Sequence, residues 1–341
     1  MDQNLNQKSP LVSVVMSVYN GQAYLHEAIR SILNQTFINF EFIIINDGSS
    51  DNSLSIINSY KDKRIICIDN FDNMGLIYSL NKGIEIAKGK YIARMDADDI
   101  SLPNRLMEQV HFLENNEKVG VLGCNYIQFN ENSETEYLAI QDQEEIMSKM
   151  IFNASVIHPS LLIRKSVLED QLIIFNPLYK HAEDYELWSR LLFATTFSNV
   201  NKTLFKYRLH QGQVTTIHST EQLKSANLIR SGILQKAGFI FSENELNIHC
   251  KIGSSQLLKD FFDLESAEKW LNNLLTQNAR LKVIDESIFR KVISKQWIDT
   301  CGNTNLGLKA FFYYFKSSLS KITHQEKTKL LIKCIIRMFK K

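Results

Sequence analysis

The stretch Lys90-Tyr-Ile-Ala-Arg-Met-Asp96-Ala-Asp98-Asp99 joins an apolar run, typical of a buried strand, to three carboxylates within four positions. Clustered carboxylates repel one another and resist desolvation, so a positive partner is expected. Mg²⁺ and Mn²⁺ prefer oxygen ligands and bind through one or two carboxylates together with substrate phosphates. Asp96 and Asp98 therefore predict a site for a metal and a diphosphate. The alternative is a solvated acidic turn before a helix that begins near Pro103.

Short apolar runs alternate with helical periodicity around this stretch, from residue 11 to about residue 129. This alternation is typical of a parallel α/β sheet. Strands are predicted at 11–18, 40–46, 64–69, 91–95 and 120–129. Helices are predicted near 23–34, 52–60, 76–87 and 103–115. The first half of the chain therefore reads as a Rossmann-like, nucleotide-binding α/β domain.

Polar residues follow three of these strands: Tyr19-Asn20, Asp47-Gly48 and the acidic cluster Asp96–Asp99. In parallel α/β sheets, ligands bind at the carboxyl ends of the strands. The three segments are therefore expected to share one site.

The rest of the chain is less regular. Helices are predicted at 144–152 and 184–194, and strands at 160–163 and 204–209, which we expect to complete the same domain. From about residue 219 the pattern is helical, with helices predicted at 263–277, 286–301, 306–319 and 324–340. The sequence thus predicts a catalytic domain over residues 1–218 and a helical region over residues 219–341.

Composition narrows the class of protein. The formal net charge of +2 gives no reason to expect nucleic acid as a partner. Five cysteines without a CxxC pair argue against a disulfide framework and a zinc site. No signal peptide or membrane-spanning run is evident in the sequence. We therefore expect a cytoplasmic protein.

Seven motifs resemble, in the same order, those of family 2 glycosyltransferases with the GT-A fold. They are Leu11-Val-Ser-Val-Val-Met-Ser-Val-Tyr-Asn20, Gln35-Thr-Phe, Ile45-Asn-Asp47-Gly-Ser-Ser-Asp51, Asn73-Met-Gly75, Asp96-Ala-Asp98-Asp99, Glu183-Asp184 and Tyr207-Arg-Leu-His210. The resemblance covers roughly residues 10 to 215. It implies an inverting transferase that moves a sugar from a nucleotide-diphospho-sugar, most often a UDP-sugar, to an acceptor hydroxyl.

The resemblance also implies a cellular setting. It suggests assembly of a bacterial surface glycan, such as capsule or lipopolysaccharide, on a lipid-linked or growing oligosaccharide. The protein would then act at the cytoplasmic face of the membrane, either free in the cytoplasm or as a peripheral protein.

Two residues are predicted to bind the nucleotide. Tyr19 is placed to stack on a pyrimidine base, and the alternative is an aromatic side chain that covers the core. Asp47 matches a carboxylate that accepts a hydrogen bond from the uracil imide in similar enzymes. The alternative for Asp47 is the first residue of an Asp-Gly turn. Asn46 replaces a second Asp of the family pattern and is assigned no role.

The resemblance divides the tasks within the acidic cluster. Asp98 is the predicted direct ligand of Mn²⁺ or Mg²⁺, and Asp96 is predicted to contact the ribose or a metal-bound water. Asp99 is expected to cap the following helix. Arg94 is close enough in sequence to help neutralise the diphosphate, and the favoured alternative is an ordinary surface salt bridge. The metal would offset the charge of the nucleoside diphosphate leaving group.

Glu183-Asp184 begins an amphipathic helix whose N-terminal dipole favours an ionised carboxylate. Asp184 is the predicted general base, and the alternative is a simple helix cap. Glu183 is predicted to orient Asp184 or to bind an acceptor hydroxyl. Base assistance of this kind contributes about 10²–10⁴ in rate.

His210 matches a position that completes the metal shell or contacts the diphosphate in similar enzymes, and imidazole is a competent ligand for Mn²⁺. A structural histidine is the alternative. Arg208 is a predicted partner of the donor phosphates through its bidentate geometry. His158-Pro159-Ser160 resembles a family segment near the acceptor cleft, although a turn before a strand explains it nearly as well.

The last predicted helix places Lys329, Lys333, Arg337 and Lys340 in a narrow basic stripe beside a wide apolar face. Such a helix is suited to the headgroup region of an anionic leaflet. The alternative is that the apolar face packs on the helical region and that the basic stripe is solvated.

Three other functions compete with sugar transfer. A sugar-phosphate nucleotidyltransferase is expected to begin with a Gly-rich basic loop, which the segment after residue 18 lacks. An NAD-dependent oxidoreductase needs a GxGxxG turn there, which is also absent. A non-catalytic GT-A subunit of a glycan-assembly complex stays open on sequence alone.

Overall fold

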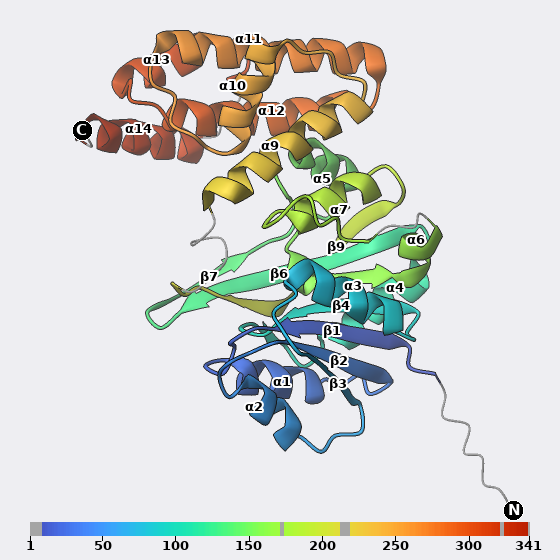
Figure 1. Cartoon of the computed structure of the whole chain (residues 1–341). Coiled ribbons are helices and arrows are strands. Elements are labelled where there is room, and N and C mark those ends of the chain that lie inside the picture. The colour runs from blue at the N-terminus through green and yellow to red at the C-terminus, as the bar shows by residue number, and fades with distance from the viewer. Residues whose placement is uncertain (1–8, 171–173, 212–218, 321–323, 340–341) are drawn as a thin grey trace, which may run out of the picture. The chain divides into compact units, whose positions relative to one another are not determined.

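The computed structural model describes residues 9–170, 174–211, 219–320 and 324–339 (Figure 1). The chain forms two compact units. The first unit comprises Met1–Asp142 and Val156–Gln222. The second comprises Gln143–Ser155 and Leu223–Lys341. The sequence predicts one boundary near residue 218, and the structure differs because residues 143–155 belong to the helical unit.

The first unit is built on one sheet, which contains nine strands within the described part of the chain. The strand order is β3-β2-β1-β4-β8-β6-β9-β5, and β7 pairs with β6. The first four strands are β1 (Val12–Val18), β2 (Phe40–Asp47), β3 (Ile65–Asn70) and β4 (Tyr91–Asp96). These four run parallel to one another, as the sequence predicts.

The remaining strands have mixed directions. They are β5 (Ile100–Ser101), β6 (Val119–Asn130), β7 (Ser133–Tyr137), β8 (Leu162–Arg164) and β9 (Thr196–Arg208). β8 lies antiparallel between β4 and β6. β9 runs parallel to β6 and antiparallel to β5. The strand predicted at 204–209 is thus the second half of a longer strand.

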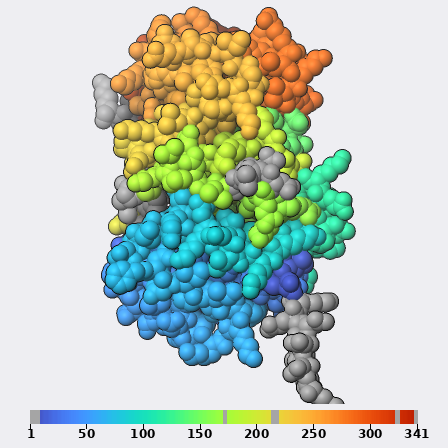
Figure 2. All heavy atoms as spheres, turned by 45° about the vertical axis from the view of Figure 1, so that its right-hand side comes forward, coloured from blue at the N-terminus to red at the C-terminus, as the bar shows by residue number. Residues whose placement is uncertain are grey.

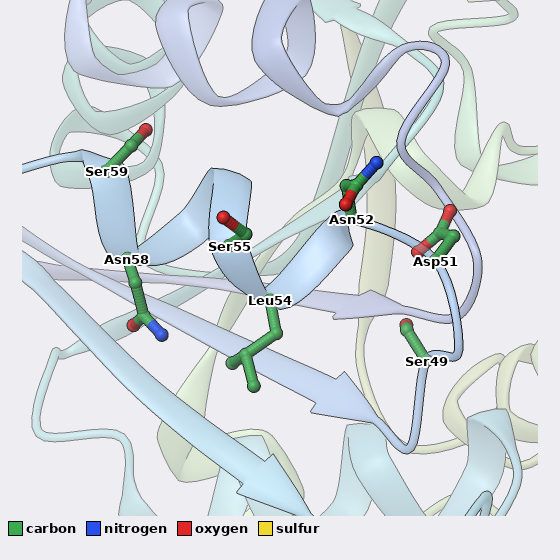
Figure 3. A pocket seen from close by; sticks show the side chains of 7 residues that line it. All are labelled: Ser49, Asp51, Asn52, Leu54, Ser55, Asn58 and Ser59. Carbon is green, nitrogen blue, oxygen red and sulfur yellow. The ribbon is translucent and has the colours of Figure 1, made fainter.

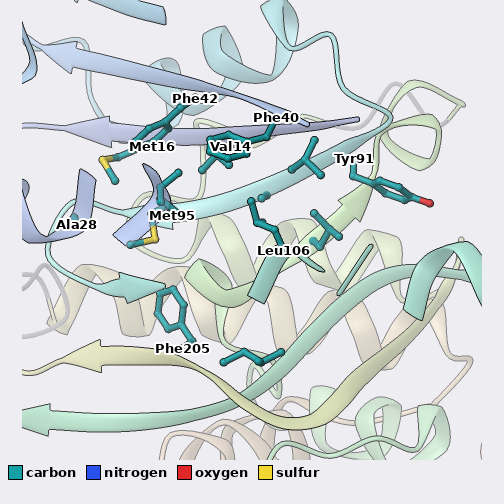
Figure 4. Close-up of a cluster of buried hydrophobic side chains, with 14 of the residues drawn as sticks. Val14, Met16, Ala28, Phe40, Phe42, Tyr91, Met95, Leu106 and Phe205 are labelled. Carbon is teal, nitrogen blue, oxygen red and sulfur yellow. The ribbon is translucent and has the colours of Figure 1, made fainter. Parts of the chain in front are cut away.

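Helices cover both faces of the parallel half of the sheet. They are α1 (Leu25–Leu33), α2 (Ser53–Ser59), α3 (Leu76–Ile86) and α4 (Arg105–Asn115). On one face, Ala28 of α1 and Leu106 of α4 pack with Val14 and Met16 of β1 (Figure 4). The strands lie between two helical layers, so their sequences are almost continuously apolar.

On the other face, α3 packs closely on β1. A Cβ atom at Gly83 would lie 2.5 Å from Cγ1 of Val15, so the helix approaches the strand because residue 83 lacks a side chain. The side chains of the first part of the chain, coloured blue to cyan, form one continuous body in the space-filling view (Figure 2).

Three shorter elements complete the first unit. They are the 3₁₀-helix η1 (His158–Ser160), α6 (Lys165–Asp170) and α7 (Glu183–Leu191). α7 buries Tyr185, Leu187, Trp188 and Leu191. These apolar residues recur at the helical spacing from which the sequence predicts this helix.

The second unit is helical. Its elements are α5 (Gln143–Met150), α10 (Glu243–Gly253), α11 (Phe261–Leu281), α12 (Glu286–Gly302), α13 (Leu308–Lys316) and α14 (His324–Phe339), and it holds most of α9 (Ser219–Lys236). Lys340, the predicted end of the last helix, lies outside the described residues. Over the described ranges, every helix is too short or too polar to cross a membrane.

Two buried side chains hold the segment after α5 in the second unit. His249 Nε2 donates a hydrogen bond to the carbonyl of Ile151 at 3.0 Å, and its Nδ1 accepts one from Trp270 Nε1 at 3.0 Å. Burial lowers the pKa of His249 to about 3, which keeps the ring neutral. Arg230 Nε donates to the carbonyl of Phe152 at 2.6 Å. The carbonyls of the two residues that follow α5 are thus satisfied by partners far along the chain.

Candidate functional site

Strand register brings the predicted site residues to one edge of the sheet. Ser17 of β1 lies opposite Asp96 of β4, and Val18 lies opposite Asn46 of β2. Tyr19, Asp47 and the acidic cluster therefore follow neighbouring strand ends, as the sequence predicts. The side chain of Tyr19 is 54% exposed, so it is accessible to a base.

The acidic cluster consists of Asp96, Asp98 and Asp99, whose nearest carboxylate oxygens all lie within 4.8 Å of one another. Burial raises the pKa of Asp99 well above its ordinary value and also raises that of Asp96. Asp99 Oδ1 accepts a hydrogen bond from the Arg208 amide at 2.8 Å. Asp99 Oδ2 is buried and has no hydrogen-bond partner among the described residues. This arrangement concentrates negative charge that a cation would stabilise.

The segment that follows the acidic cluster is fixed by Gln35. Its Nε2 donates to the carbonyls of Ser101 at 3.3 Å and Leu102 at 2.8 Å, and its Oε1 accepts from the Leu106 amide at 3.0 Å. The Gln35-Thr-Phe motif therefore has a structural function: it joins the end of α1 to β5 and to the start of α4.

The end of β9 adds His210 to the acidic cluster. Pairing of β5 with β9 brings the two segments together. His210 Nε2 lies 2.9 Å from Oδ2 of Asp98, and the His210 ring lies 5.0 Å from the ring of Tyr24. The two residues that the sequence predicts as metal ligands are therefore in direct contact.

Arg208 supports the acidic cluster from the same strand end. Its Nε donates to the carbonyl of Asp98 at 2.7 Å, and its guanidinium pairs with Glu27. The guanidinium carbon lies 4.5 Å from the ring centres of both Tyr24 and Phe129. These contacts orient the guanidinium toward the protein's own groups, and contact with a donor phosphate stays a prediction.

Arg94 is buried, so the predicted surface salt bridge is wrong. Its guanidinium donates to the carboxylate of Asp96 and to the carbonyl of Met95. Its positive charge also opposes the rise in the pKa of Glu183 and Asp184. Arg94 thus faces carboxylates of both the acidic cluster and α7.

Glu183 and Asp184 form the first turn of α7. Asp184 Oδ1 accepts a hydrogen bond from the Tyr185 amide at 2.6 Å. Burial raises the pKa of Glu183 to about 7, and the charge of Asp184 adds to this rise. Burial also raises the pKa of Asp184, and the charge of Asp96 contributes. Desolvation therefore outweighs the helix dipole, which the sequence alone would not show.

His158 lies beside Asp184, with its Nδ1 4.0 Å from Asp184 Oδ2. The ring packs against Phe175 and Trp188, with ring centres 5.5 Å from each. Burial holds the pKa of His158 well below its ordinary value, so the imidazole is neutral. Its Nε2 is buried without a hydrogen-bond partner in the described ranges. The sequence singles out His158 but does not predict this contact.

Tyr207 also faces the carboxylates and has no predicted role. Burial raises the pKa of its phenol, and the charges of Asp99, Asp96, Asp98 and Asp184 raise it further. The alternation of side chains along β9 could have predicted this orientation, because Tyr207 lies two residues after the buried Phe205 and therefore on the same face. A neutral hydroxyl is therefore held near both acidic groups.

Asp47 is buried, and both of its oxygens accept hydrogen bonds. Oδ1 accepts from Asn70 Nδ2 at 2.8 Å and from the Met74 amide at 3.0 Å, and Oδ2 accepts from the Gly75 amide at 2.8 Å. Gly48, with φ +67°, lets the two loops meet, because a Cβ atom there would lie 2.4 Å from the backbone of Asp72. Asp47 thus fixes the Asn73-Met-Gly75 motif, and its contact with uracil stays a prediction.

A shallow hollow lies along α2 and the segment that precedes it (Figure 3). It is lined by Ser49, Asp51, Asn52, Leu54, Ser55, Asn58 and Ser59. The carboxylate of Asp51 accepts hydrogen bonds from the amides of Gln22 and Ser53. The hollow contains none of the predicted site residues.

Comparison with known proteins gives consistent matches. The family described as "Glycosyl transferase family 2" matches residues 13–172. An uncharacterized glycosyltransferase of Haemophilus influenzae is 34% identical over 282 residues, which cover 79% of this chain and 85% of that protein. The Escherichia coli protein WfaP, a UDP-Glc:alpha-D-GlcNAc-diphosphoundecaprenol beta-1,3-glucosyltransferase, is 32% identical over 65% of this chain and 86% of its own length.

A solved structure with the same fold is that of Staphylococcus aureus TarS residues 1–349 in complex with UDP-GlcNAc. The TM-score is 0.58 at 16% sequence identity, and the match covers 95% of this chain and 90% of TarS 1–349. At this identity the likeness concerns the fold.

Proposed function

The chain belongs to glycosyltransferase family 2 and has the predicted GT-A fold, and from this we propose that it is a metal-dependent, inverting sugar transferase. The proposed donor is a UDP-sugar that carries a hexosyl or N-acetylhexosaminyl group. The proposed acceptor is a hydroxyl of a lipid-linked glycan.

One observation supports the proposal above all others. Burial raises the pKa of Asp184, and the charge of Asp96 raises it further, although the two residues come from the start of α7 and the end of β4. Arg94 opposes that rise for Asp184 and also pairs with Asp96. The acidic cluster and the proposed base therefore share one electrostatic environment, as a single displacement requires.

The acidic cluster fits a hard divalent cation. It offers carboxylate oxygens close together, and Asp99 Oδ2 is a buried acceptor without a partner in the described structure. Asp98, Asp96 and His210 are the proposed ligands of Mn²⁺ or Mg²⁺. When bound, the ion would offset the negative charge that builds up on the departing diphosphate.

Asp184 is the proposed general base. Its Oδ1 accepts from the Tyr185 amide, which orients the carboxylate and leaves Oδ2 to accept the acceptor proton. Its raised pKa moves it toward the operating pH, which suits a general base. The acceptor oxygen then attacks the anomeric carbon from the face opposite the diphosphate, so an α-linked donor gives a β-linked product. The name of WfaP likewise specifies a beta linkage.

Glu183 and His158 are proposed to position the acceptor. Glu183 is buried next to Asp184 in the chain, and its pKa of about 7 keeps it partly protonated near neutral pH. The neutral ring of His158 lies with its Nδ1 4.0 Å from Asp184 Oδ2. Both side chains therefore restrict the orientations available to Asp184.

The proposed donor is supported by three residues of the first unit and by one relative. Tyr19 is proposed to stack on uracil, and Asp47 is proposed to recognise its imide from the fixed loop of Met74 and Gly75. Arg208 is proposed to contribute positive charge near the diphosphate. The name of WfaP specifies UDP-Glc as its donor. A UDP-sugar agrees with these features.

The acceptor proposal rests on relatives. WfaP is named for transfer to a GlcNAc unit that is attached to a diphosphoundecaprenol lipid. We extend this acceptor class to the present chain and place the reaction in the synthesis of a bacterial surface polysaccharide, such as capsule or lipopolysaccharide.

The test measures the melting temperature of the purified protein with each member of a panel of nucleotide sugars. We expect one UDP-sugar to raise the melting temperature only when Mn²⁺ or Mg²⁺ is present. The same sugar should be hydrolysed slowly to release UDP, and Asp98→Ala should abolish that release. Binding without UDP release, with any acceptor tested, would indicate a non-catalytic subunit instead.

A further inference from the structure

Helix α14 has two apolar faces. Leu330 and Cys334 are buried, one turn apart, and form the inner face. Ile332, Ile335 and Ile336 form an outer face, here called the isoleucine face, with exposed fractions of 50%, 40% and 49%. At 100° per residue the isoleucines lie roughly opposite Leu330 and Cys334. The sequence predicts one wide apolar face, and the structure divides it.

Two of the predicted stripe cations lie at the border between these faces. Lys333 Nζ pairs with Asp299 Oδ1 at 3.1 Å, and Arg337 Nη2 donates to Asn303 Oδ1 at 2.7 Å. Asp299 lies in α12, and Asn303 directly follows the last residue of that helix. The cations therefore anchor α14 with its isoleucine face directed outward, and Lys329 is exposed beside that face.

Helix α13 adds exposed aromatic surface. Phe312 and Phe315 are both exposed, and the ammonium group of Lys327 lies 4.9 Å from the ring centre of Phe315. This contact places the ring of Phe315 beside α14. Aromatic and basic residues thus accompany the isoleucines.

Positive charge is concentrated in the last part of the chain, from the start of α13 onward. Residues 308–341 contain nine Lys or Arg residues and one acidic residue, Glu326, which gives a net charge of +8. The whole chain carries +2, so the preceding 307 residues carry −6. A basic partner is therefore disfavoured at this end of the chain, and so is a second copy of the same face.

We propose that the isoleucine face binds the surface of an anionic lipid bilayer. Apolar side chains flanked by lysine suit the boundary between headgroups and acyl chains, and each basic residue near an anionic leaflet strengthens binding. The helix lies on the membrane, because it is too short and too polar to cross one. The contact does not depend on sugar transfer, so it is testable without a donor or an acceptor.

The experiment measures co-sedimentation of the whole 341-residue chain with two kinds of vesicle. One kind contains phosphatidylcholine alone, and the other also contains the anionic lipid phosphatidylglycerol. We expect binding only to the anionic vesicles and a decrease on addition of salt. Ile332→Ser/Ile335→Ser/Ile336→Ser should weaken binding by at least about tenfold, because apolar burial is lost. Lys329→Glu should weaken it by about fivefold to tenfold.

Two matched controls change the same residue types on other parts of the helical unit. Ile240→Ser removes an 80% exposed isoleucine before α10, and Lys295→Glu reverses an exposed lysine on α12. Neither should change vesicle binding. Circular dichroism and UDP release should match the wild type for all these variants.

Three results would overturn the proposal. The first is wild-type protein that does not bind anionic vesicles. The second is binding that the isoleucine variant retains. The third is a wild-type dimer in light scattering that the isoleucine variant converts to a monomer, since the face would then join two copies of the chain.

Discussion

His210 Nε2 lies 2.9 Å from Oδ2 of Asp98, although 112 residues separate them in the chain. The contact forms because β5 and β9 pair beside the acidic cluster. A side chain from the end of β9 thus completes a group that begins at the end of β4. The proposed roles of the two residues predict that they act together.

Asp98→Asn should reduce UDP release by at least about 100-fold, because it removes a charged ligand where charge develops in the transition state. His210→Ala should reduce it by about 10–100-fold. The measurement is UDP release at saturating donor, with Mn²⁺ or Mg²⁺ varied. Chelation of the metal should abolish the wild-type rate, and restoring the ion should recover it.

Asp51→Asn is the matched control, because it makes the same substitution at the hollow on α2. It should leave the rate unchanged. An Asp98→Asn protein with the wild-type rate and metal dependence would contradict the assignment of Asp98 as a ligand.

Asp184→Asn should lower kcat by about 10²–10⁴ and leave the donor KM unchanged, because only proton removal is lost. The amide oxygen of Asn can still accept from the Tyr185 amide, so the start of α7 should persist. Steady-state kinetics with donor and acceptor varied provide the measurement. A decrease below tenfold would direct attention to Glu183 as the base.

Glu183 predicts a pH dependence of stability. Burial, followed by the charge of Asp184, raises its pKa from 4.5 to about 7, while Arg94 opposes the rise and Asp96 adds to it. Between pH 4.5 and about 7 the folded state holds a proton that the unfolded chain has released. The free energy of unfolding therefore falls as the pH rises through this window, by at most about 1.4 kcal/mol per pH unit.

Urea denaturation at a series of pH values measures this slope. Glu183→Gln should flatten it and should make the protein more stable than the wild type above pH 7. Glu243→Gln, at an exposed position in the first turn of α10, should keep the wild-type slope. Equal slopes for the wild type and Glu183→Gln would show that Glu183 is not the titrating group.

Arg94→Met should lower the free energy of unfolding by about 3–5 kcal/mol, because Asp96 loses the cation that neutralises it. The double variant Arg94→Met/Asp96→Asn should regain part of this loss, since the unpaired carboxylate is then absent. Chemical denaturation of the single and double variants measures the coupling. Additive losses would mean that the two side chains do not stabilise each other.

The parallel half of the fold was predictable because β1, β2 and β4 are buried on both faces. Their apolar runs are therefore nearly continuous, and the strand ends predicted from them differ from the structure by at most one residue. The first half of β9 escaped prediction because Asn201 and Lys202 interrupt its apolar pattern. α10 was not predicted because its first turn is polar and its buried residues begin only at Ile248.

The composition of the site was also largely predictable, because its carboxylates follow strand ends or begin a helix. The burial of Arg94 was not, since it depends on η1, which packs beside β4 only in the folded protein. The neutral state of His158 likewise results from its contacts with Phe175 and Trp188. Such properties arise from tertiary packing, which periodicity does not report.

The placement of residues 143–155 with the helical unit has a consequence for protein engineering. The chain passes between the units three times, so a single cut near residue 218 would strip Ile151 and Phe152 of the His249 and Arg230 bonds that satisfy their carbonyls. A chimera with a relative would have to exchange this short insert together with everything after residue 222. The two units therefore cannot be separated or exchanged at a single point of the chain.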